Sequence, residues 1–116
     1  MTTSTDTASD VSWVPTACTL PTVAQPLRVA EFDQFFGSAV EHVTRTDRTS
    51  LRLSLTPEPT VAATAAELVA REAHCCGFFT FALMVAPPSL DLVVEVPADH
   101  VDVLNALELR ARSARR

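Results

Sequence analysis

Alternating apolar and polar residues predict the β-strands of this chain. Residues 49–56 place three leucines on one face and polar side chains on the other, which is the pattern of a half-buried strand. Residues 79–85 and 90–96 alternate in the same way, and the prolines between them predict a turn. Residues 40–45 are short and fit either a strand or the end of a helix. The chain therefore contains one clear hairpin and a second that depends on residues 40–45.

Apolar residues that recur every three or four positions predict three helices. The helices are expected at residues 27–37, at residues 60–76 and from Asp99 onward. Gly37 and Gly77 are placed to end the first two helices, and Thr60 is placed to cap the second. Glu72 is expected on the outer, solvent-facing side of that helix, with Arg71.

The order of these elements predicts an α+β fold. Two hairpins alternate with three helices (α-ββ-α-ββ-α), so we expect a two-layer sandwich with one four-stranded antiparallel sheet covered by helices. Residues 27–116 would form this single domain. Residues 1–26 are rich in Thr, Ser and Asp and then in Pro, which predicts a disordered or strap-like tail. Eight residues are expected to face the helices: Leu51, Leu53, Leu55, Phe79, Phe81, Leu83, Leu92 and Val94.

Composition narrows the classes of function. The chain has 116 residues, 47% of them hydrophobic, which suits one domain with one core. Its net charge of -5 argues against direct binding to nucleic acid. It has no apolar run long enough for a membrane helix and no secretory signal, so we expect a cytoplasmic protein. All nine basic residues are arginine, which we interpret as codon bias of a GC-rich bacterium. Two glycines are too few for a phosphate-binding loop.

The chemistry is expected at the cysteines. Cys75 and Cys76 are adjacent at the end of the second helix, and Cys18 lies between prolines in the tail. Three cysteines do not suggest a disulfide framework, so we expect thiols. At a helix end two sulfurs can converge on one soft ion, and Cys18 can supply a third. This predicts a site for Hg(II), As(III), Cd(II) or Pb(II), with His74 as a weaker candidate. The competing interpretation is that the cysteines only pack as small hydrophobic residues.

A catalytic role is disfavoured. A helix C-terminus carries partial negative charge, which opposes a bare thiolate but favours a cation held between thiols. No organic cofactor is indicated. Two alternatives remain. One is a small-ligand or protein-interaction module whose six phenylalanines line an apolar pocket; the other is a thiol enzyme of lyase type that acts on carbon–mercury bonds.

The run REAHCCGFFTFAL, residues 71–83, resembles a small domain of actinobacterial proteins with a CC-x-F-F/L-x-F motif. That domain occurs alone or as a C-terminal extension of MerR-type heavy-metal-responsive regulators, and the resemblance covers roughly residues 60–110. It implies a heavy-metal or mercury-resistance context, with a metal-responsive regulator or a second copy of the chain as partner. The Cys-Cys and Phe-Phe pairs are also similar to a segment of alkylmercury lyase, although no catalytic Asp can be assigned.

Overall fold

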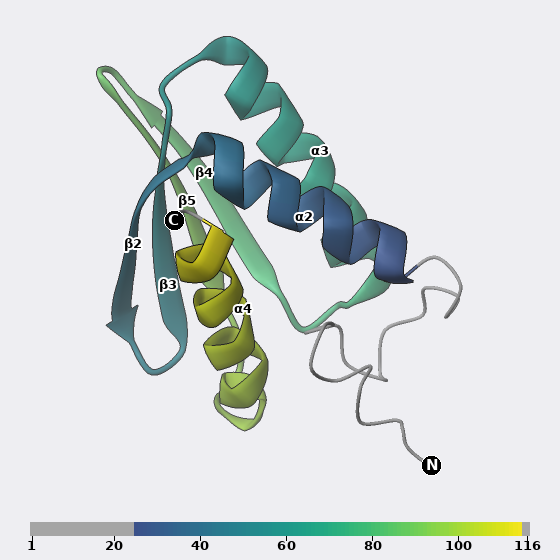
Figure 1. Ribbon diagram of the computed structural model, residues 1–116. Coiled ribbons are helices and arrows are strands. Elements are labelled where there is room, and N and C mark those ends of the chain that lie inside the picture. Colours follow the sequence, from purple (N-terminus) through teal and green to yellow (C-terminus); the bar gives the residue numbers. More distant parts are fainter. Residues whose placement is uncertain (1–24, 115–116) are drawn as a thin grey trace.

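One four-stranded antiparallel sheet packs against three helices in the computed structural model, which describes residues 25–114 apart from the side chains of residues 25–28 and 75 (Figure 1). The elements follow in the order α2 (Gln25–Ala39), β2 (Val40–Asp47), β3 (Ser50–Leu55), α3 (Pro59–Cys75), β4 (Thr80–Ala86), β5 (Ser89–Glu95), the 3-10 turn η2 (Ala98–His100) and α4 (Val101–Ala114). The predicted α+β sandwich is confirmed, and residues 40–45 belong to a strand. The predicted tail lies outside the described residues, except that residues 25 and 26 begin α2.

The sheet is built around its two central strands. The strand order is β2-β3-β5-β4, so each hairpin contributes one inner and one outer strand. The inner strands pair antiparallel, with Leu51 opposite Val94 and Leu53 opposite Leu92. All four of these side chains are buried, as expected for one apolar face of a pleated sheet. Of the eight residues predicted to face helices, six are buried, whereas Phe81 and Leu83 on the outer strand β4 are half-buried.

The helices close this face with large side chains. Phe36 of α2 and Leu104 of α4 are among the most completely buried residues, and both belong to one continuous core with the sheet leucines. Apolar burial at roughly 25 cal/mol per Å² is the main source of stability for such a layer. No helix in the described part of the chain is long and apolar enough to cross a membrane.

Two helix boundaries differ from the prediction. Gly37 does not end α2, which continues to Ala39; a Cβ atom at Gly37 would lie 3.2 Å from the carbonyl oxygen of Ala114, so glycine here permits α4 to pack closely. Thr60 does not cap α3, which begins at Pro59 after Glu58 and has no side-chain cap. Proline suits the first turn of a helix because its missing N–H has no partner to lose there.

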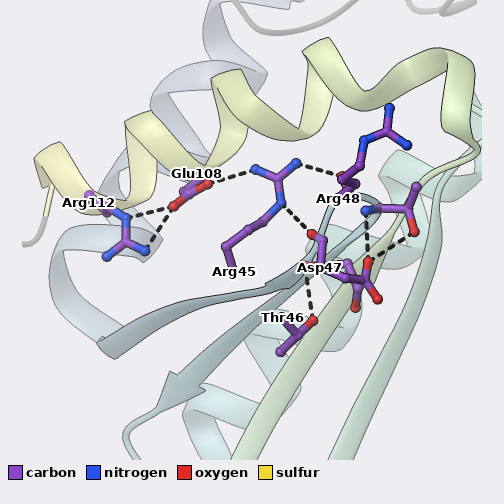
Figure 2. Close-up of polar contacts among 8 residues, drawn as sticks. Arg45, Thr46, Asp47, Arg48, Glu108 and Arg112 are labelled. Atoms are coloured by element: carbon purple, nitrogen blue, oxygen red, sulfur yellow. Dashed lines mark hydrogen bonds and ion pairs between the residues drawn. The ribbon is translucent and has the colours of Figure 1, made fainter.

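The turn between β2 and β3 is tied to α4 by ionic contacts (Figure 2). Arg45 donates from Nε to the carbonyl oxygen of Asp47 (2.8 Å), from Nη2 to that of Arg48 (2.6 Å), and from Nη1 to Oε1 of Glu108 (2.8 Å). Arg112 donates to the other carboxylate oxygen of Glu108 from Nε, at 2.9 Å. Burial raises the pKa of Glu108, but the hydrogen bonds and positive charges of the two arginines outweigh this and lower the pKa below its ordinary value of 4.5.

Candidate functional site

Cys76 occupies a fixed position where α3 ends and the chain turns into β4. Its side chain is buried, with 2% of its surface exposed. Its N–H donates to the carbonyl oxygen of Glu72 (2.7 Å), and its own carbonyl oxygen accepts from the N–H of Phe79 (3.2 Å). These two bonds close the last turn of the helix and the turn that follows. Gly77, predicted to end α3, follows Cys76 without a positive φ, so the hydrogen bonds close the turn without a left-handed residue.

Cys76 is disulfide-bonded, and the expectation that its thiol is free is therefore wrong for this structure. The chain has two other cysteines, Cys18 and Cys75, and both side chains lie outside the described residues. Within the described part of the chain, no group of three or more His, Cys, Asp or Glu side chains is clustered to hold a metal ion. Cys18 and the side chain of Cys75 lie outside this part of the chain, so the predicted three-cysteine set stays a prediction.

Glu72 lies on the inner side of α3 and not on its outer side as predicted. Its exposed fraction is 0%, so it is a fully buried carboxyl group. It precedes Cys76 by four positions, one helical turn, and accepts the Cys76 N–H through its backbone. Charged residues are rarely buried completely unless they are paired, which is why the composition alone places Glu72 outside. The helical spacing indicates the inner side, because Glu72 follows Leu68 by four positions and so lies on the same face of the helix.

Aromatic rings surround the turn that holds Cys76. Phe78 stacks on His100 with ring centroids 4.1 Å apart and an angle of 11° between the rings, and Phe79 lies between Phe78 (4.7 Å) and Phe81 (5.1 Å). The stack joins the turn after α3 to η2 at the start of the last helix. His100 therefore has a half-buried packing position, which its isolated place in the sequence does not reveal.

The six phenylalanines belong to the core or pack against it. Four are buried in the core and two are packed against it. Of the cavities described, the one between α2 and α3 has Phe35 in its lining, and those beside β4 and α4 have no phenylalanine. In the described part of the chain these rings pack in or against the core, and a pocket beside the cysteines stays a prediction.

The charges near Cys76 do not form the surroundings of an activated nucleophile. Arg71, the nearest arginine in sequence, pairs with Glu31 of α2 at 3.1 Å, and both side chains are exposed. His74 is exposed in the last turn of α3, and His42 is exposed on β2. Thiolates that act as nucleophiles are stabilised by helix N-termini or adjacent cations. Cys76 instead lies at the C-terminus of α3, where the helix dipole favours a bound cation.

Comparisons with protein-family models, with curated proteins and with solved structures find no match to this chain. The candidate site is therefore defined by its own chemistry: a buried cysteine in a disulfide, a buried carboxyl group and a wall of aromatic rings.

Proposed function

We propose that the reduced chain binds a thiophilic metal or metalloid ion through Cys76 together with Cys75 and Cys18. The observation that supports this most directly is the disulfide at Cys76, because a disulfide requires a second cysteine sulfur within about 2 Å. Two sulfurs that approach so closely in the oxidised chain can hold one soft ion between them in the reduced chain.

Ion binding by the oxidised chain requires two steps, reduction of the disulfide and then coordination of the ion. A dithiol reductant supplies two electrons and two protons, which open the disulfide and leave two thiols. A soft ion such as Hg(II) then takes both sulfurs as thiolates and releases the two protons to solvent. A third thiol completes the trigonal set of sulfurs that As(III) accepts.

The surroundings of Cys76 support a soft ion over a hard one. Cys76 belongs to the apolar core and offers a sulfur ligand, whereas hard cations such as Mg²⁺ require oxygen ligands and water. The negative end of α3 offsets part of the positive charge of an ion. The two backbone hydrogen bonds of Cys76 hold its position, so little reorganisation is needed when the ion binds.

The direct test is a metal titration of the reduced protein. The chain is reduced with a phosphine, the reductant is removed under anaerobic conditions, and the protein is titrated with Hg(II) and As(III) in competition with a small dithiol. Cys75→Ser and Cys76→Ser should each lose Hg(II) affinity by orders of magnitude, because a hydroxyl does not ionise at neutral pH. Cys18→Ser should weaken Hg(II) binding less and As(III) binding more.

Three controls separate this function from its alternatives. Cys76→Ala keeps the buried position apolar, so a loss of binding in this variant reports the missing thiol and not a buried hydroxyl. The protein before reduction should present one free thiol of three, since the disulfide uses two, and it should bind Hg(II) more weakly. Equal binding by the wild type and all cysteine variants would show that the cysteines only pack. Release of a hydrocarbon from an organomercurial would indicate the lyase.

The biological setting of this function is a heavy-metal response in a bacterial cytoplasm. The resemblance of residues 71–83 to the domain fused to metal-responsive regulators supports this setting. The partner would be such a regulator, which supplies the DNA-binding part, or a second copy of the chain.

A further inference from the structure

The two edges of the sheet differ in how they are protected from pairing with another strand. The edge strand β2 carries four ionisable side chains, and its register with β3 shifts at two places. Charged residues and bulges are the devices by which natural proteins keep an exposed edge from adding a further strand. These features disfavour pairing of the β2 edge with a further strand.

The edge at β4 has none of these devices. The strand reads TFALMVA, without a charge or a proline, and its register with β5 is unbroken from Thr80 to Ala86. It is the outer strand of the described sheet, so one of its two backbone edges has no strand beside it there. A seven-residue apolar edge of this kind is a template for pairing.

The side chains of β4 are incompletely covered. Phe81 and Leu83 are half-buried and Val85 is 68% exposed, although their partners across β5 are buried. The helical layer reaches β4, because α3 packs against it, but it leaves part of this strand uncovered. Val85 also lines a cavity of about 420 Å³ that it shares with Ala62 of α3 and Leu90 of β5.

We propose that β4 pairs antiparallel with β4 of a second copy of this chain, which joins the two sheets into one of eight strands. A twofold axis through Leu83 places each Phe81 opposite the partner's Val85 and each Ala82 opposite the partner's Met84. Aromatic and β-branched side chains are favourable cross-strand pairs, and no like charges meet. The same register brings the partner's Phe81 beside the cavity at Val85.

The uncharged, self-complementary sequence of β4 favours a second copy as the occupant. Each chain carries a net charge of -5, so two copies repel each other, and a seam is least costly where neither copy contributes a charge. The β4 edge is such a place. An isologous dimer needs only one self-complementary surface, and this strand complements itself residue by residue. Pro87 and Pro88, which lack an N–H, end the ladder after Ala86.

The test compares two substitutions at equally exposed apolar residues. Val85 is 68% exposed on β4, and Leu109 is 67% exposed on α4, remote from the proposed seam. The mass of the full-length wild type, Val85→Lys and Leu109→Lys is measured by sedimentation over a wide concentration series, with reductant present to exclude intermolecular disulfides. We expect a dimer for the wild type and for Leu109→Lys. Val85→Lys should raise the dimer Kd at least about tenfold, because it places two lysines in each seam.

Several outcomes would overturn the proposal. They are a monomeric wild type across the series, an equal loss of dimer in both variants, or an undiminished dimer in Val85→Lys. Hydrogen exchange adds an independent measurement on the β4 amides that point away from β5: they should be protected in the dimer and exchange faster in Val85→Lys. Slow exchange of these outward-directed amides in a monomeric chain would assign the edge to another segment of the same chain.

Discussion

Replacing Glu108 with glutamine removes the charge that ties the β2–β3 turn to α4. Glu108 uses both oxygens, one for Arg45 and one for Arg112, and glutamine offers a single oxygen. One arginine would therefore face an amide NH₂ group in place of an acceptor. The substitution changes neither the length nor the shape of the side chain, so the measured effect reports the charge and its hydrogen bonds.

The magnitude follows from the exposure of the two pairs. Arg45 and Glu108 are each only 20% exposed, and a hydrogen bond to a charged group in such a place contributes roughly 1.5–3 kcal/mol before solvent screening. Arg112 is 46% exposed, and an i,i+4 pair of this kind contributes about 0.3–0.5 kcal/mol. Glutamine keeps part of these two contributions, so we expect Glu108→Gln to lower the free energy of unfolding by about 1–2 kcal/mol. For a domain of this size that lowers Tm by roughly 5–10 °C.

The effect of Glu108→Gln should depend on pH with a definite sign. The pKa of Glu108 is lower in the folded chain than its ordinary value of 4.5, so its ionised form stabilises the fold. This contribution is complete above 4.5 and is lost as the pH falls through the lowered pKa. The difference in Tm between wild type and Glu108→Gln should therefore be full at neutral pH and shrink in acid. Thermal denaturation followed by circular dichroism at several pH values measures it.

A matched control is Glu67→Gln on α3. Glu67 is exposed and forms no ion pair with the described residues, so its substitution should change stability by less than about 0.5 kcal/mol. An equal Tm for wild type and Glu108→Gln at neutral pH, or a difference that persists undiminished in acid, would refute the assigned role of this carboxylate.

Further substitutions test the core and the turns. Leu104→Ala removes a fully buried side chain and should cost about 2–5 kcal/mol in urea denaturation, whereas Leu109→Ala on the exposed side of the same helix should cost far less. Gly77→Ala should stabilise the chain by about 0.4–1 kcal/mol, because φ is not positive there and no atom lies near the added methyl group. Gly37→Ala should not share this gain, since its methyl group would press on the backbone of Ala114. A Tm that rises equally in both glycine variants would contradict this contrast.

Periodicity was sufficient to predict the sheet. Apolar and polar residues alternate in residues 49–56 and 90–96. An extended strand places the alternating apolar side chains on one face, which a helix would not do. The chain positions of β3 and β5 were therefore predicted within about a residue. The incomplete cover of β4 was not predicted, because alternation gives the face of a side chain but not the reach of the helices above it.

The candidate site was predicted less completely than the sheet. The end of α3 and the turn at Cys76 follow from local sequence, and the structure places them there. Glu72 was misplaced because its charge outweighed its spacing in the prediction. The stack of Phe78 on His100 joins residues 22 positions apart in the chain, and no local pattern reports a contact of that kind.

The pairing of β3 with β5 has a consequence for the time at which this protein can fold. Residues 50–55 are synthesised long before residues 89–95, which supply their neighbour in the sheet. The core also needs Leu104, Leu107 and Ala111 of α4. On a ribosome that adds about 5–20 residues per second, the first hairpin would wait seconds with its leucines uncovered.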